Sequence, residues 1–407
     1  MTTRDSIDSS AFSYSLPVER IARHPLERRD QSKLLVYREG EIAQDTFSRL
    51  PGYLPKDSWL VFNDTRVIQA RLSFRKESGA RIEIFCLEPF SPSGYEESLA
   101  REETCVWRCL VGNARKWKGG RLLLDVGGAH SGNSGFAVEA WLEERTGTEF
   151  LIRFRWSAAD WSFARILEEF GKTPIPPYLN REAEVDDRTR YQTVYGQLDG
   201  SVAAPTAGLH FTPEMLRELE ERDMPVSRLT LHVGAGTFIP VKEGNARDHA
   251  MHAELVLVGL EFLEKWRNDP RKLIAVGTTS TRSLESLYWL GVKMLRNQPE
   301  PGNVRIDQWE NEELPQNHTL EESLTSLVAY MKEQGLHTLR FHTRLMIVPG
   351  YRFRCIRGLL TNFHMPSSTL LLLIAALLGD DWRRVYDHAL SHGFRFLSYG
   401  DSSLLLP

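Results

Sequence analysis

Cysteine is scarce in this sequence, with four residues, Cys86, Cys105, Cys109 and Cys355, among 407. None of them forms a C-x-x-C pair, and Cys105 and Cys109 stand apart as C-x3-C. A structural zinc site normally needs four nitrogen or sulfur ligands at tighter spacing, so we predict no metal. Low cysteine use is typical of the reducing cytoplasm, where we expect the protein to work.

Long apolar runs are also missing. The N-terminal segment MTTRDSIDSSAFSYSL has no apolar stretch of the kind that a signal peptide carries. The most apolar run, Leu370 to Leu378, is nine residues long and too short to span a bilayer. We therefore expect no membrane partner and predict a buried core helix at this run.

An excess of positive charge is absent as well, because the formal net charge is −4 and the pI is about 6.3. A nucleic-acid partner would need a local basic surface on this mildly acidic chain. A cation beside an aromatic ring suits phosphate contact and base stacking, although each such residue alone is more often ordinary solvated surface. The candidates for this contact are Arg66, Arg71, Arg115, Lys116, Trp117 and Lys118.

The length favours about two domains, and the texture of the chain changes along it. Residues 33–38 and 58–62 are predicted strands. From about 66 to 155, short β-like runs alternate with glycine turns, which predicts a small antiparallel sheet or barrel. Helices are predicted over 157–171, 213–224, 278–290 and 367–379, with a buried strand over 273–277.

Residues 297–317 are rich in Pro, Asn and Glu. This composition predicts an exposed loop or mobile insertion. The simplest interpretation is a solvated linker without a function of its own.

The segment VAAPTAGLHFTPEML (202–216) places His210 at a sharp turn before a helix, because Pro205 and Gly208 force an irregular backbone. A histidine there is suited to general acid or base chemistry, since its pKa lies near neutrality. The alternative is a capping turn with a hydrogen-bonded histidine.

The segment AVGTTSTRSLES (275–286) has the order strand, glycine, hydroxyl cluster and helix. Free N–H groups and the helix dipole would favour a carboxylate or phosphate there. The segment lacks the lysine of a P-loop, so an ATPase is not indicated. A plain N-cap formed by Thr279 or Ser280 is the alternative.

Two neighbouring segments suggest ligand contact less strongly. In LTLHVGAGTFIPV (229–241), Gly234 and Gly236 form a G-x-G at which a ligand could touch main chain, or only a bulge. In DHAMHAE (248–254), His252 and Glu254 would share one face if the stretch were a strand. That arrangement suits proton transfer, and a polar surface is the alternative.

The segment LLTNFHMPSSTLLLL (359–373) puts Asn362 and His364 in a loop before an apolar helix. Polar groups on a loop held by a rigid core element are a common site arrangement. A helix cap at Ser367 or Ser368 is the alternative.

Together these segments resemble one family, the S-adenosylmethionine:tRNA ribosyltransferase-isomerases of queuosine biosynthesis. The similar stretches occur in the family's order and are FNDTRVIQARL (62–72), YQTVYG (191–196), VAAPTAGLHF (202–211), LHVGAGTF (231–238), HAMHAE (249–254), AVGTTSTRSLES (275–286), TNFHMPSSTLLLL (361–373) and FRFLSYGD (394–401). The resemblance spans roughly residues 12 to 401 with gaps.

The resemblance implies transfer and isomerisation of the ribosyl part of S-adenosylmethionine onto 7-aminomethyl-7-deazaguanine at the tRNA wobble position. The products would be epoxyqueuosine-tRNA, adenine and methionine. The implied fold is α+β: a large α/β domain with a mixed sheet (1–65 and 156–407, with 297–335 a probable insertion) and a small inserted antiparallel β-barrel domain (66–155). S-adenosylmethionine would be the co-substrate, without a metal, and we expect a monomer.

The chemistry implied by the resemblance needs proton transfer, because a base removes a C5′ hydrogen beside the sulfonium and adenine leaves. We predict His210 and Glu254 for these steps, with His252 and His364 as alternates. The residues predicted to hold the co-substrate are Gly234, Gly236, Gly277, Thr278, Thr279, Ser280, Arg282 and Asn362.

The sequence departs from the family at a few positions. Residues 286–349 are longer than usual, Phe74 stands where the family usually has Gly, and Phe394 replaces the usual Tyr. These departures leave open a paralogue that acts on another nucleobase, or a binder of tRNA or an adenosyl ligand that has lost catalysis.

Overall fold

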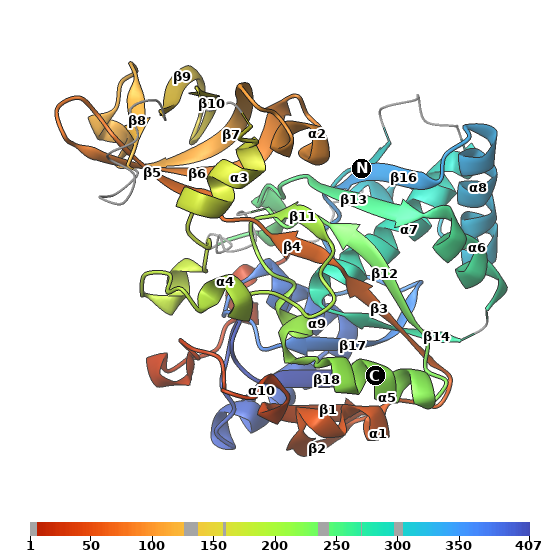
Figure 1. Cartoon of the computed structure of the whole chain (residues 1–407). Helices are drawn as coiled ribbons and strands as arrows, with labels where there is room; N and C mark the ends of the chain where they lie inside the picture. The colour runs from red at the N-terminus through yellow and green to blue at the C-terminus, as the bar shows by residue number, and fades with distance from the viewer. Residues whose placement is uncertain (1–5, 126–136, 158–159, 235–243, 270, 297–303) are drawn as a thin grey trace.

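A computed structural model describes the chain except for residues 1–5, 126–136, 158–159, 235–243, 270 and 297–303 (Figure 1). Its centre is a ten-stranded mixed sheet in the order β15-β16-β13-β12-β3-β14-β17-β18-β1-β2. The strands in chain order are β1 (Lys33–Arg38), β2 (Glu41–Thr46), β3 (Ser58–Asn63), β12 (Val226–Leu231), β13 (Glu254–Gly259), β14 (Lys272–Val276), β15 (Arg305–Ile306), β16 (Thr338–Thr343), β17 (Ile356–Asn362) and β18 (Ser402–Leu406).

The central strands are buried on both faces, because side chains alternate between two cores. Trp59 and Val61 of β3 belong to one hydrophobic cluster, whereas Leu60 and Phe62 belong to another. The first cluster packs beneath α6 (Leu260–Asn268), α7 (Thr278–Arg296), α8 (Leu320–Glu333), α9 (Thr369–Leu378) and α10 (Asp381–Ser391). The second packs beneath α1 (Leu50–Tyr53) and α5 (Pro213–Glu221).

A closed six-stranded barrel stands beside this domain (Figure 1). Its pairs are all antiparallel, in the order β10-β7-β6-β5-β8-β9. Its strands are β5 (Arg71–Arg75), β6 (Arg81–Ser91), β7 (Thr104–Gly112), β8 (Leu122–Leu124), β9 (Val138–Thr146) and β10 (Glu149–Trp156). The α+β class with an antiparallel barrel is therefore confirmed, and Cys86, Cys105 and Cys109 are buried, unpaired members of the barrel core.

Most predicted elements occur where their patterns place them. The strands at 33–38 and 58–62 are β1 and β3, and the helix at 213–224 is α5, capped by Thr212. The apolar run is α9, whose residues from Leu371 to Ala375 are buried and which Ser368 caps. The predicted core helix is thus confirmed.

Two predicted elements differ from the structure. The helix expected from Ser157 is α3 (Phe163–Phe170), because Ser162 is its cap and the Trp156 indole N–H donates to the carbonyl of Trp161, 2.7 Å away. The described part of 297–317 is not an exposed loop. Its strand β15 pairs with β16, and Val304, Ile306 and Leu314 are buried, so sparse apolar residues were enough to fix it.

Neither a membrane-crossing helix nor a metal cluster occurs within the described ranges. No helix there is both long and apolar enough to cross a bilayer. No group of three or more His, Cys, Asp or Glu side chains there is placed to hold a metal ion.

Candidate functional site

A cavity of about 320 Å³ lies where β14 and β17 end. Five of the segments that resemble the family contribute to its wall, through residues within 203–207, 277–279, 361–370 and 397–398, and through Val233. Pro177 and Tyr178 complete it. None of the lining residues that the structure describes is an Asp, Glu, Lys or Arg. The segments, distant in sequence, therefore converge on one uncharged pocket of the size that small ligands occupy.

The floor of the cavity is the turn from β14 into α7. Gly277 adopts a φ of +93°, which side-chain-bearing residues rarely take, and its N–H donates to the Leu360 carbonyl of β17 at 2.8 Å. Thr278 and Thr279 then line the cavity. The first turn of a helix has N–H groups without an intrahelical acceptor, and the helix dipole favours an anion there. The predicted arrangement of glycine, hydroxyl groups and helix start is present.

Ser280 and Arg282 of the same segment lie away from the cavity. The Ser280 hydroxyl donates to the Val276 carbonyl at 2.8 Å, and Arg282 forms an ion pair of 2.7 Å with Glu254. Each residue advances about 100° around a helix, so adjacent positions cannot all face one pocket. The structure thus brings Gly277, Thr278 and Thr279 to the cavity, without the next members of the motif.

Of the four predicted acid–base residues, His364 lines the cavity. The Thr361 hydroxyl lies 3.0 Å from His364 Nε2, and the backbone N–H of His364 donates to the Tyr386 hydroxyl at 3.1 Å. Burial lowers the pKa of His364 to about 3. The imidazole is therefore neutral near pH 7, and a neutral imidazole has one nitrogen able to accept a proton.

His210 lies behind the cavity wall, at the end of a 3₁₀ turn (Thr206–His210). Its Nδ1 is 2.9 Å from the Ser32 hydroxyl, and its Nε2 is 3.2 Å from the side-chain nitrogen of Asn362, which does line the cavity. Burial lowers the pKa of His210 to about 4. The ring is 4% exposed and contacts the cavity through Asn362.

Glu254 and His252 do not share a face of a strand. Strand β13 begins at Glu254, whose side chain is buried, paired with Arg282 and 3.4 Å from the N–H of Gly234. His252 precedes the strand and is exposed. The proximity predicted from the i, i+2 spacing required both residues to be in one strand. Gly236 lies outside the described residues.

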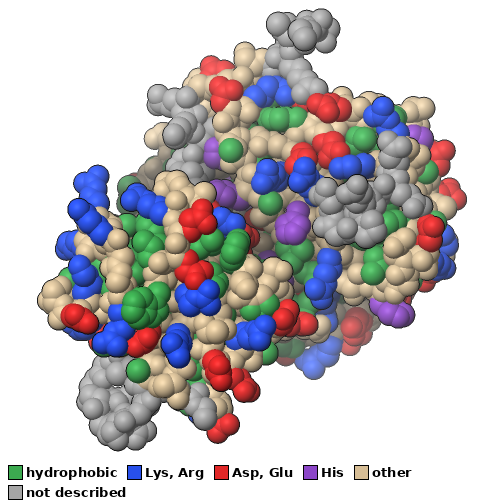
Figure 2. Space-filling model, turned by 90° about the horizontal axis from the view of Figure 1, so that it is seen from above, with side chains coloured by type: hydrophobic (Ala, Val, Ile, Leu, Met, Phe, Trp, Pro, Cys, Tyr) green, Lys and Arg blue, Asp and Glu red, His purple; other side chains and the backbone are tan. Residues whose placement is uncertain are grey.

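A cleft of about 2030 Å³ separates the barrel from the large domain. Arginine, histidine and several Asp and Glu side chains line it, and Figure 2 shows basic, acidic and histidine side chains around this hollow. The cleft adjoins the smaller cavity. Pro177 lines both, and Val233 of the cavity is followed by Gly234 of the cleft. Across the cleft, Tyr95 of the barrel contacts His232 of the large domain, with ring centroids 4.3 Å apart.

One wall of the cleft carries basic residues that the sequence interpretation missed. Arg340, His342 and Arg344 lie at alternate positions on and just after β16, are exposed and line the cleft; we call them the β16 basic row. Partial desolvation in the cleft lowers the pKa of His342, so Arg340 and Arg344 carry the fixed charges. The alternation in TLRFHTR was the available signal.

The predicted nucleic-acid residues are divided between three places. Arg71 lines the cleft, over the ring of Phe85, and Arg66 is exposed near Asp199. Arg115, Lys116 and Lys118 are exposed on the barrel.

Trp117 is not available for base stacking, because it is 2% exposed and belongs to the barrel core. Its indole N–H donates to the Gly120 carbonyl at 3.1 Å. The prediction of a stacking role for Trp117 is therefore wrong. The adjacent charges are solvated while the ring itself fills the barrel.

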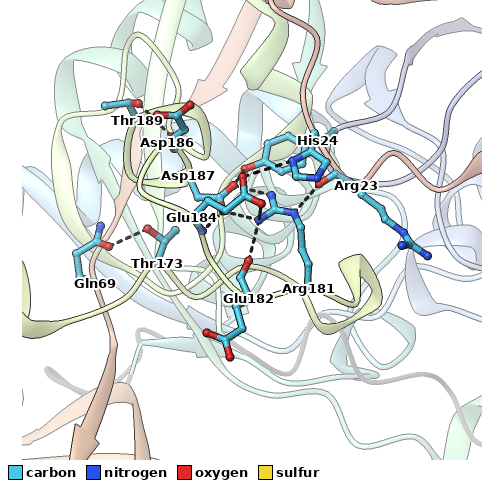
Figure 3. Close-up of polar contacts among 11 residues, drawn as sticks. Arg23, His24, Gln69, Thr173, Arg181, Glu182, Glu184, Asp186, Asp187 and Thr189 are labelled. Atoms are coloured by element: carbon cyan, nitrogen blue, oxygen red, sulfur yellow. Dashed lines mark hydrogen bonds and ion pairs between the residues drawn. The ribbon is translucent and has the colours of Figure 1, made fainter. Parts of the chain in front are cut away.

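A polar cluster fixes the segment that follows Pro177 and Tyr178 (Figure 3). Arg181 donates to both carboxylate oxygens of Asp187, at 2.7 and 2.8 Å, and to the carbonyl of Arg23 at 2.9 Å. Burial alone would raise the pKa of Asp187, but hydrogen bonds from Arg181, the Glu184 N–H and Tyr399 outweigh it and lower that pKa. The charged pair thus ties one lip of the cavity to the N-terminal segment.

Comparison with known proteins gives the same family throughout. A family model described as "Queuosine biosynthesis protein" matches residues 9–405. Relatives named S-adenosylmethionine:tRNA ribosyltransferase-isomerase include one from Trichlorobacter lovleyi, 37% identical over 402 residues (97% of this chain and 98% of the relative). Another, from Thermus thermophilus, is 38% identical over 404 residues (97% and 99%).

A crystal structure of S-adenosylmethionine tRNA ribosyltransferase from Thermotoga maritima is 27% identical in sequence, with a TM-score of 0.46. The match covers 98% of this chain and 100% of the Thermotoga chain. The family match and the identities over nearly the full length of the relatives place the sequence without ambiguity. The chain belongs to the queuosine biosynthesis family, the family of the S-adenosylmethionine:tRNA ribosyltransferase-isomerases.

Proposed function

We propose that this chain transfers and isomerises the ribosyl moiety of S-adenosylmethionine onto 7-aminomethyl-7-deazaguanine at the tRNA wobble position. The products are epoxyqueuosine-tRNA, adenine and methionine. The names of its relatives support this activity. The single structural observation that carries the proposal is the convergence of five family segments on one uncharged cavity beside a large cleft.

We assign S-adenosylmethionine to the cavity of about 320 Å³. Its wall is largely apolar with a few polar groups, which is the usual composition of a small-ligand site. Gly277, Thr278 and Thr279 supply the start of α7 for a carboxylate. The imidazole of His364 is neutral, so it does not repel the sulfonium charge.

We assign the anticodon of tRNA to the cleft. Pro177 lines both the cleft and the cavity, so we propose that a base held in the cleft approaches a ribosyl group held in the cavity. The β16 basic row and Arg71 supply positive charge there. We propose that residues 66–155 form the inserted barrel domain, and that 1–65 with 156–407 form the catalytic domain, with 297–335 an insertion within it. Because one chain lines both hollows, we propose that it acts as a monomer.

The chemistry requires a base near the carbon next to the sulfonium. We propose His364 for this role, because it lines the cavity and its neutral ring can accept the C5′ proton. The amine of the deazaguanine then bonds to the sugar and loses a proton, adenine leaves with a proton, and cleavage of the C5′–S bond releases methionine. His252 lies in the adjoining cleft, at the side from which the tRNA base approaches, and is the proposed alternate for that second proton transfer.

The test is an assay with purified protein, S-adenosylmethionine and tRNA that carries 7-aminomethyl-7-deazaguanine. Adenine release is followed together with the mass of the modified nucleoside. Release of adenine with the matching mass gain on tRNA is the expected result. Binding of tRNA without turnover would replace the proposal with a non-catalytic binder, and turnover with a different base alone would replace the acceptor.

A further inference from the structure

Two buried side-chain atoms of the cavity wall have no hydrogen-bond partner among the described residues: Asn362 Oδ1 and Thr279 Oγ1. Both side chains are buried, at 3% and 9% exposure, and both line the cavity. A buried polar group without a partner is destabilising, so native proteins rarely retain one without a reason. A ligand in the cavity would supply the missing partners.

The orientation of the Asn362 amide is determined by its neighbours. Its nitrogen lies 3.4 Å from the backbone carbonyl of Asp401, which accepts hydrogen bonds and cannot donate. The same nitrogen lies 3.2 Å from Nε2 of His210. A neutral His210 accepts there and carries its proton on Nδ1, which faces the Ser32 hydroxyl at 2.9 Å. The unpartnered oxygen of Asn362 is therefore an acceptor.

Asn362 and Thr279 sit on adjacent elements. Asn362 ends β17, which pairs with β14, and β14 leads through Gly277 into the first turn of α7. One side of this corner thus offers a hydrogen-bond acceptor. The other offers a hydroxyl and the N–H end of a helix, which favours negative charge. An α-amino acid carries an ammonium and a carboxylate on one carbon, and these two groups match the two sides.

We propose that this corner binds the amino-acid end of S-adenosylmethionine, with the ammonium donating to Asn362 Oδ1 and the carboxylate at Thr279 and the start of α7. This inference rests on the proposed function for the identity of the ligand. His210 is then a positioning residue, whose Nε2 holds the amide so that its oxygen faces the cavity. It neither touches the reacting atoms nor acts as the base.

The first experiment measures equilibrium binding in the absence of tRNA. The probes are S-adenosylmethionine and 5′-deoxy-5′-methylthioadenosine, which has the same nucleoside without the amino-acid end. Asn362→Leu and Thr279→Val remove the two polar atoms at nearly constant volume, and Thr279→Ser restores the hydroxyl. Ser286→Ala is the matched control, because its hydroxyl is buried on the same helix and bonds Thr343 outside the cavity.

The expected result is that Asn362→Leu raises the Kd of S-adenosylmethionine by about 10-fold or more, as loss of a hydrogen bond to a charged group does. The Kd of the methylthio nucleoside stays within about twofold by the same reasoning, since it has no ammonium. Thr279→Ser binds like the native protein. An equal loss for both probes would mean that Asn362 contacts the nucleoside, and unchanged binding of both would mean that it contacts neither; each overturns the proposal.

The role of His210 is tested by steady-state kinetics with tRNA. His210→Phe keeps an aromatic ring but no acceptor, whereas His210→Gln retains a side-chain oxygen that can accept from Asn362. We expect His210→Phe to raise KM for S-adenosylmethionine by about 10-fold with kcat little changed, and His210→Gln to recover most of the loss. A fall in kcat of about 100-fold at saturating co-substrate, in both variants, would identify His210 as the base instead.

The binding and kinetic results separate the two proposals. Weaker S-adenosylmethionine binding in Asn362→Leu without any tRNA turnover by the native chain would support the corner and refute the transferase. If the native chain modifies tRNA but the variants bind S-adenosylmethionine as tightly as the native chain does, the transferase is supported and the corner is refuted. Thermal unfolding of each variant shows whether it is folded. If Asn362→Leu does not fold, the binding measurement with Thr279→Val tests the proposal instead.

Discussion

Removal of the two fixed charges of the β16 basic row is expected to weaken tRNA binding in a salt-dependent manner. Arg340 and Arg344 line the cleft, and no carboxylate partner for either occurs within the described part of the chain. Alternate residues of a strand are about 6.6–6.8 Å apart, so we expect the row to lie along an extended nucleic-acid backbone. The perturbation is Arg340→Gln with Arg344→Gln.

The magnitude follows from counterion release. Each phosphate contact contributes about −0.7 to −0.9 to the slope of log K against log salt concentration, so loss of two contacts makes the slope shallower by about 1.4–1.8. Between 50 and 200 mM salt, that difference corresponds to about a 7- to 12-fold change in the ratio of native to variant affinity. Binding of S-adenosylmethionine should not change.

The assay is fluorescence anisotropy of a labelled anticodon stem-loop at several salt concentrations. The control is Arg217→Gln on α5 with Arg222→Gln at the C-cap of α5, since it removes the same charge from exposed positions that do not line the cleft. An unchanged slope in the β16 variant would refute the reasoning. Arg115→Gln with Lys116→Gln, measured in the same way, tests whether these barrel residues contact RNA, as the sequence predicts.

Three other changes test different parts of the account. His364→Asn should lower single-turnover adenine release by about 100- to 10,000-fold while the Kd of S-adenosylmethionine stays within a few fold; unimpaired release would remove it as the base. Arg282→Leu removes the cation of the ion pair with buried Glu254 and should lower the free energy of unfolding by about 3–5 kcal/mol in urea titrations, and a change below about 1 kcal/mol would contradict this. Burial lowers the pKa of His232 to about 4, so between pH 6.5 and 4 the unfolded chain binds a proton that the native chain does not, and stability falls as pH falls. His232→Gln should therefore make unfolding free energy depend less steeply on pH in that window, by an amount equivalent to at most one bound proton. Denaturation at several pH values checks this.

Local periodicity in the sequence was sufficient to predict the barrel and several single strands and helices. The large mixed-sheet domain was predicted only from the resemblance of the motifs to the family. The sequence could not show which side of each motif faces the ligand. Thr279 lines the cavity and Ser280 does not, although both are polar helix-start residues. The helical phase decides between them, and that phase depends on how α7 packs against the sheet.

The histidines illustrate the same limit. His210 and His364 both follow irregular turns, and composition gives no reason to prefer either. Only the tertiary structure shows that Asn362 lies between His210 and the cavity. A tryptophan among cations is typical of RNA contact, and this local pattern could not show that the ring of Trp117 is buried in the barrel core.

The order of strands also has a consequence for synthesis of the protein. Strand β18 lies between β17 and β1, so the hairpin of β1 and β2 is joined to the rest of the sheet through β18. A ribosome makes β1 long before β18, and β1 must wait for its partner. The barrel, in contrast, is contiguous in sequence and can close while the chain is still emerging. Co-translational folding should therefore proceed from the barrel outward, and the ligand cavity, which needs Leu397 and Ser398, forms late.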